Sequence, residues 1–88
     1  MSRQISQPHR QLRRKEQEAV TRYLTALVET YPGTKGKVRV VTRQDNRIIV
    51  KIPLPPRVSE RMRLFDRMAE VGTKLLLETD QYIILSSR

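Results

Sequence analysis

The 88-residue sequence predicts one α+β domain, a two-layer sandwich with two helices on one face of an antiparallel sheet of three to four strands. Apolar residues recur at helical spacing before Pro32 and again after Pro56, and two runs rich in Val and Ile lie between these segments. The expected element order is α-β-β-α-β-β. This domain is expected to cover residues 9–88, and residues 1–8, which offer little to bury, are expected to form a disordered basic arm.

The first predicted helix ends at Pro32-Gly33, because proline cannot continue a helix and glycine tolerates a left-handed exit. Glu16 interrupts its apolar stripe. The other members of the stripe recur at helical spacing: Leu12, Ala19, Val20, Tyr23, Leu24, Leu27, Val28 and Tyr31. On the opposite side, Glu18 and Arg22 are spaced for an i,i+4 ion pair.

Residues 37–43 and 47–52 predict two strands joined by a three-residue loop that ends at Asn46, a residue that tolerates left-handed backbone. A two-residue turn would mix cations and aliphatic side chains on both faces, whereas the longer loop separates them. One face then holds Val38, Val40 and Thr42 opposite Ile52, Val50 and Ile48. The other face holds Arg39, Val41 and Arg43 opposite Lys51, Ile49 and Arg47. A slip by one residue would bury arginines, so burial fixes this register.

A second helix is predicted from about Arg57 to Gly72, where glycine is interpreted as the C-terminal stop. The segment from Thr73 to Leu85 fits either a continued helix and one strand or a hairpin. The succession of glycine, apolar run, polar turn and β-branched run favours the hairpin, over residues 74–78 and 81–85. The core is expected to contain the inward aliphatic residues of the first hairpin, together with Leu24, Leu27, Met62, Phe65 and Met68.

The formal charge of +9 is concentrated in two segments. Residues 1–15 carry five cations and no acid, and residues 35–63 carry nine cations against Asp45 and Glu60. Clustered basic residues are typical of proteins that bind polyanions. We therefore predict that three groups of basic residues contact phosphates. They are the outward cations of the hairpin, the lysine that precedes its first strand and the arginines of the N-terminal arm. These residues are Arg39, Arg43, Arg47, Lys51, Lys37, Arg10, Arg13 and Arg14.

The expected partner is nucleic acid, either duplex DNA or structured RNA. Proteins that bind single strands stack bases on several aromatic rings, and of the four aromatic residues only Tyr82 is expected outside the core. The alternative is a small interaction or regulatory module whose basic face docks an acidic protein. Val41 and Ile49, exposed within the cationic face, motivate that alternative. A purely solubilising basic face that protects an edge strand is a third interpretation.

Several function classes are disfavoured by the residues themselves. The chain has no cysteine and a single histidine, His9, and it contains no phosphate-binding loop, so we expect neither a metal or cofactor nor catalysis. The GxxG spacing of Gly33–Gly36 is that of KH modules, but a strand follows at once, so we interpret it as a helix-ending turn. No apolar run reaches 18 residues, which predicts a cytoplasmic protein without membrane contact. Homodimerisation through the first helix or a sheet edge stays open.

Overall fold

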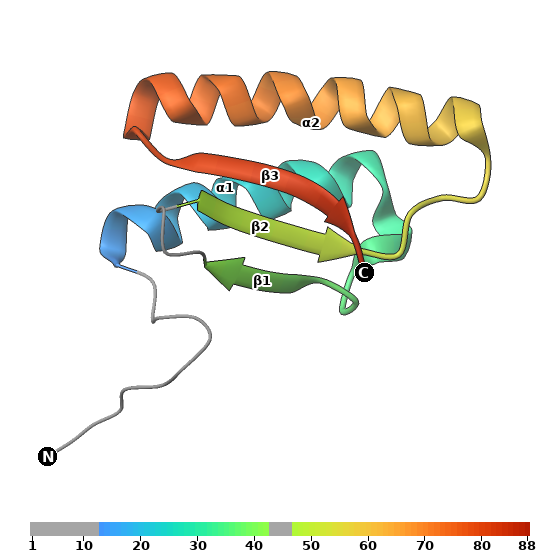
Figure 1. The fold of residues 1–88 in the computed structure, drawn as a ribbon, viewed down its shortest axis with the longest axis horizontal. Coiled ribbons are helices and arrows are strands. Elements are labelled where there is room, and N and C mark those ends of the chain that lie inside the picture. The colour runs from blue at the N-terminus through green and yellow to red at the C-terminus, as the bar shows by residue number, and fades with distance from the viewer. Residues whose placement is uncertain (1–12, 43–46) are drawn as a thin grey trace, which may run out of the picture.

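The structure, a computed structural model, describes residues 13–42 and 47–88 of the chain. It is an α+β fold with two α-helices, a short 3-10 helix and a three-stranded sheet (Figure 1). Its elements are α1 (Arg14–Thr30), η1 (Pro32–Thr34), β1 (Arg39–Thr42), β2 (Arg47–Ile52), α2 (Val58–Thr79) and β3 (Tyr82–Ser87). The α-β-β-α part of the predicted order is confirmed, and the predicted arm lies outside the described residues.

The core lies between the sheet and the two helices, which share one hydrophobic cluster. From β2, Ile48, Val50 and Ile52 are completely buried. The helices contribute Ala19, Val20, Tyr23 and Leu27 from α1 and Leu64, Met68 and Leu75 from α2. The predicted two-layer arrangement of helices and sheet is therefore confirmed.

Met62 and Phe65 do not belong to this core, contrary to expectation, since they are 62% and 37% exposed. Helix α2 turns a different face inward, marked by Leu64, Met68 and Leu75 at helical spacing. The apolar surface of α2 is wider than the sheet and α1 can cover, and Met62 and Phe65 lie on the uncovered part.

The sheet is mixed rather than fully antiparallel. Strands β1 and β2 pair antiparallel, but β3 pairs parallel with β2. Residues 74–78, predicted as a strand, belong to α2, so the expected second hairpin is wrong. The 22 residues of α2 span about 33 Å at 1.5 Å per residue, which returns the chain to the end of the sheet where β2 begins (Figure 1). The strand that follows must then run in the direction of β2.

Gly72 lies inside α2 and does not end it. A Cβ atom at this position would lie 3.4 Å from the carbonyl oxygen of Ile83 and 3.8 Å from the ring of Tyr23. The missing side chain therefore allows close approach of α2 to β3, which offsets the roughly 1 kcal/mol cost of glycine in a helix interior. The helix ends at Asp80, whose backbone is left-handed, with φ 62° and ψ 26°.

Glu16, the residue that interrupts the apolar stripe of α1, is itself buried and caps the N-terminus of the helix. Its Oε1 atom accepts a hydrogen bond from the backbone N–H of Arg13 at 2.8 Å. This contact is one half of a capping box, and a carboxylate at a helix N-terminus also interacts favourably with the helix dipole. Glu16 therefore has a structural role as an N-terminal capping residue.

Arg22 connects the two helices. Its Nη2 atom donates a 2.6 Å hydrogen bond to Oε1 of Glu78 near the end of α2, rather than pairing with Glu18 as expected. This hydrogen bond from Arg22 lowers the pKa of the Glu78 carboxyl below its ordinary value.

Replacing Arg22 with Gln should raise the pKa of Glu78 toward its ordinary value. The pKa of Glu78 is lower in the folded protein than in the unfolded chain, so the ion pair stabilises the fold at neutral pH. This stabilisation is lost as the pH falls through the folded-state pKa. Side-chain NMR of Glu78 during an acid titration measures the change. Arg67→Gln, on the same helix as Glu78, should leave the titration as it is; an unaltered Glu78 pKa in R22Q would contradict the assignment.

Asp80→Gly should be more stable than Asp80→Ala by about 1 kcal/mol, because glycine adopts the left-handed conformation without steric cost. Both variants remove the carboxylate from the C-terminus of α2, so the comparison isolates the backbone term. Urea unfolding monitored by circular dichroism gives the difference. Equal midpoints would show that the left-handed turn is not maintained in solution.

Candidate nucleic-acid interface

The register of the first hairpin is the predicted one. Arg39 lies opposite Lys51, Val41 opposite Ile49, and Thr42 opposite Ile48. Burial alternates along β2, where every second side chain is fully enclosed and the others are partly or fully exposed. Because neighbouring side chains on a strand point to opposite faces, the cations of β1 and β2 point away from the helices.

Strand β3 adds a third column to this face. Its parallel register sets Tyr82 beside Arg47, Ile84 beside Ile49 and Ser86 beside Lys51. We call the surface formed by the outward side chains of the three strands the outer face: Arg39, Val41, Arg47, Ile49, Lys51, Tyr82, Ile84 and Ser86. The hydrophobic core lies on the opposite side of the sheet, so neither helix covers the outer face (Figure 1).

The outer face has an aliphatic centre between two polar ends. The register aligns Val41, Ile49 and Ile84 as a row across all three strands. One end holds Arg39 and Lys51, and the other holds Arg47 beside a half-exposed Tyr82. The ends are about 13 Å apart, the length of four residues of an extended strand. Among the eight residues of the outer face, none is acidic.

Arg88 joins the end that contains Arg39 and Lys51. Its backbone N–H donates to the carbonyl oxygen of Ile52 at 3.0 Å, which extends the ladder between β2 and β3. Its Nη1 atom donates to the carbonyl oxygen of Lys37 at 3.4 Å. Four basic residues, Lys37, Arg39, Lys51 and Arg88, therefore gather around the start of β1. Sequence reasoning missed Arg88, because its position depends on the parallel direction of β3.

The other residues predicted to contact phosphates do not lie on the outer face of the described structure. Arg13 and Arg14 are exposed at the start of α1, at the end of the molecule where β2 and β3 begin but in the helix layer (Figure 1). They do not form part of the outer face. Arg10 and Arg43 lie outside the described residues.

Two basic residues of α2, Arg61 and Arg67, have polar partners within the protein. Nη1 of Arg61 donates to the carbonyl oxygens of Pro55 and Pro56 at 3.1 and 2.8 Å, which fixes the connector before the helix. Arg67 approaches Glu70 at 3.5 Å, one helical turn away. Both arginines are therefore engaged within the protein, and we do not include them among the phosphate contacts.

Neither Tyr23 nor the carboxylates of the described residues form a metal site. Burial raises the pKa of the Tyr23 hydroxyl, which packs in the core between α1 and α2. Across residues 13–42 and 47–88, no three His, Asp or Glu side chains converge as a group that could hold a metal ion.

Comparison with known proteins finds no protein-family model, curated protein or solved structure that matches this chain. Within the part of the chain that the structure describes, neither helix has the length and apolar character needed to cross a bilayer.

Lys51→Glu should stabilise the fold by roughly 0.5 kcal/mol, because it converts a like-charged cross-strand pair with Arg39 into an oppositely charged one. Arg39→Glu should have a similar effect. The double variant restores like charges and should lose the gain, so a double-mutant cycle in urea isolates the pair. Additive effects of the two changes would mean that the side chains do not interact.

Proposed function

We propose that the protein is a non-catalytic nucleic-acid-binding protein that contacts phosphates through the outer face of its sheet. The observation that carries the proposal is the common placement of Arg39, Arg47 and Lys51 on a face without acidic residues and without a covering helix. Arg88 and Lys37 add two cations beside that face.

The arrangement favours a polyanion on energetic grounds. Arg39 and Lys51 are directly opposite each other, which costs a few tenths of a kcal/mol in the free protein. A phosphate between them removes the repulsion and forms two charge-assisted hydrogen bonds. The same residues therefore destabilise the isolated domain slightly and stabilise its complex.

The geometry favours a double helix over an extended single strand. The two basic ends of the outer face are about 13 Å apart, close to the about 12 Å width of the major groove of B-DNA. A row of Val41, Ile49 and Ile84 offers no hydrogen bonds to bases. Tyr82 is the single aromatic side chain of the face, so stacking of successive bases has little support. Duplex DNA or structured RNA, contacted mainly at its backbone, suits this surface.

The basic residues at the start of α1 extend the same proposal. Arg13 and Arg14, with Arg10 before them, would contact backbone phosphates where the nucleic acid passes the end of the sheet at which β2 begins. Arg43, which follows β1 in the sequence, would contribute a further phosphate contact.

A second candidate function is the docking of an acidic protein. The aliphatic row of Val41, Ile49 and Ile84 supports it, because an uncovered apolar row between charged ends resembles the composition of a protein interface. A protein partner would bury this row, whereas a nucleic acid would leave it largely hydrated.

Titration of duplex DNA and of structured RNA at several salt concentrations tests the proposal. If about five phosphates are engaged, the logarithm of the binding constant should fall with the logarithm of salt concentration with a slope of roughly −4 to −5. Arg47→Glu and Lys51→Glu should each weaken binding and make that slope shallower by about 1.

The matched control is Arg63→Glu, which changes the charge equally on an exposed position of α2, behind the sheet. It should leave the slope nearly as in the unaltered protein. Absence of binding at low salt, or equal weakening by R63E and R47E, would refute the proposed interface. Enrichment of acidic proteins by the outer face after nuclease treatment, with no nucleic-acid binding, would favour the second candidate.

A further inference from the structure

Three of the four aromatic residues of the chain line one groove between α2 and β3. Tyr23 reaches the groove from α1, Phe65 from α2 and Tyr82 from β3. Phe65 and Tyr82 are 37% and 50% exposed, although aromatic rings contribute much to stability when they are buried. The groove therefore offers aromatic surface that the core does not use.

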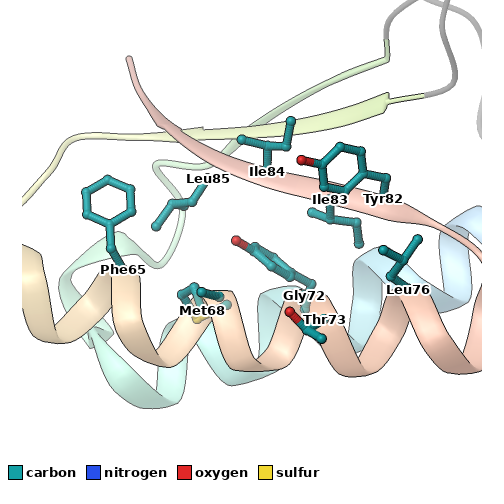
Figure 2. Close-up of a pocket in the computed structure, with 11 residues that line it drawn as sticks. Phe65, Met68, Gly72, Thr73, Leu76, Tyr82, Ile83, Ile84 and Leu85 are labelled. Atoms are coloured by element: carbon teal, nitrogen blue, oxygen red, sulfur yellow. The ribbon is translucent and has the colours of Figure 1, made fainter.

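The groove has the size and character of a site for a small molecule. Its volume is about 320 Å³, and its lining residues, all in the described part of the chain, include no charged side chain. Phe65 lies at the end near Leu85, and Leu76 lies at the other end near Tyr82 (Figure 2). Ligand pockets are mostly apolar and begin at about 300 Å³. Because an apolar cavity of about 150 Å³ suffices for benzene, this groove has room for two rings.

The hydroxyl end of Tyr23 lies in the middle of the groove. Gly72, which lies between the two ends (Figure 2), has no side chain to separate α2 from the groups that face it. A Cβ atom at this position would lie 3.8 Å from Cε2 of Tyr23. Cε2 is bonded to the ring carbon that carries the hydroxyl group. The ring therefore brings its polar end, rather than its apolar end, to the level of Gly72.

The Tyr23 hydroxyl has no hydrogen-bond partner among residues 13–42 and 47–88, although the residue is only 1% exposed. Most buried polar groups in folded proteins are hydrogen-bonded, because an unpartnered one costs free energy. Burial raises the pKa of this hydroxyl, so it remains a neutral donor at physiological pH. An unused donor inside an apolar groove is suited to a ligand that carries an acceptor.

We propose that the groove binds a small uncharged molecule of one or two aromatic rings, and that Tyr23 donates a hydrogen bond to an acceptor on that molecule. Phe65 and Tyr82 contact the rings of the ligand, since aromatic pairs attract each other beyond the effect of burial alone. The thioether of Met68 adds a favourable contact with an aromatic ring. A charged ligand is disfavoured, because no opposite charge lines the groove to offset its desolvation.

A peptide strand or a second copy of the chain fits the site less well than a small molecule. The carbonyl oxygen of Ile83, in the middle of β3, would lie 3.4 Å from a Cβ atom at Gly72. This carbonyl is packed against α2 of the same chain, so it is not available to pair with an added strand. The ligand site lies beside the outer face and does not depend on nucleic-acid binding.

Tyr23→Phe tests the starting observation without any ligand. Removal of an unpartnered hydroxyl should leave the urea midpoint unchanged or slightly higher. The matched control is Thr34→Val, because the buried Thr34 hydroxyl donates to the carbonyl oxygen of Tyr31 at 2.9 Å. T34V should lower the midpoint. A similar decrease in Y23F would show that the Tyr23 hydroxyl has a partner inside the protein and would overturn the proposal.

NMR titration with 2-acetylnaphthalene, an uncharged ketone with two rings, tests the site itself. The amide resonances of Gly72 and Ile83 should shift and saturate at millimolar concentrations or below. Y23F should bind the ketone about fivefold more weakly, which is the effect of one net hydrogen bond. Naphthalene, which lacks the acceptor, should bind the variant and the unaltered protein equally.

Tyr31→Phe and Tyr82→Phe are the control variants for binding. Tyr31 does not line the groove, and the half-exposed Tyr82 is expected to contribute its ring rather than its hydroxyl. Both variants should retain the affinity for the ketone. Weaker binding in Y82F with none in Y23F, equal losses for both probes in Y23F, or no saturable shift up to the solubility of the probes would each overturn the proposal. A doubled chain mass by diffusion NMR, with no shift by either probe, would assign the groove to a second copy instead.

Discussion

Burial of the inward aliphatic side chains of β2 is the constraint from which the rest of the structure follows. Ile48, Val50 and Ile52 are fully buried, and a shift of one residue would turn Arg47 and Lys51 toward the core. The cost of burying an unpaired charge amounts to several kcal/mol, far more than the repulsion between the outward cations. The core therefore determines the outer face, although none of the core residues belongs to it.

The length of α2 is the second determinant. By reaching Thr79 the helix returns the chain to the start of the sheet, and β3 becomes parallel to β2. That direction brings Tyr82 beside Arg47 and Arg88 near Lys37. Among the described residues, neither the sheet nor α1 covers the far side of α2, because a three-stranded sheet is too narrow for the apolar surface of a long helix. One helix thus completes the basic surface and creates the apolar one.

The sequence by itself determined the α-β-β-α order, the two-layer arrangement and the register of the first hairpin, because each depends on local periodicity and on the sign of the charges along one strand. It also determined that Arg39, Arg47 and Lys51 share a face. Only the tertiary structure decided where α2 ends, since a buried glycine in close contact with β3 and a helix-ending glycine have the same local sequence. The direction of β3, the placement of Tyr82 and Arg88, and the exposure of Phe65 depend on that end point, because they arise from contacts between segments that are distant in the chain.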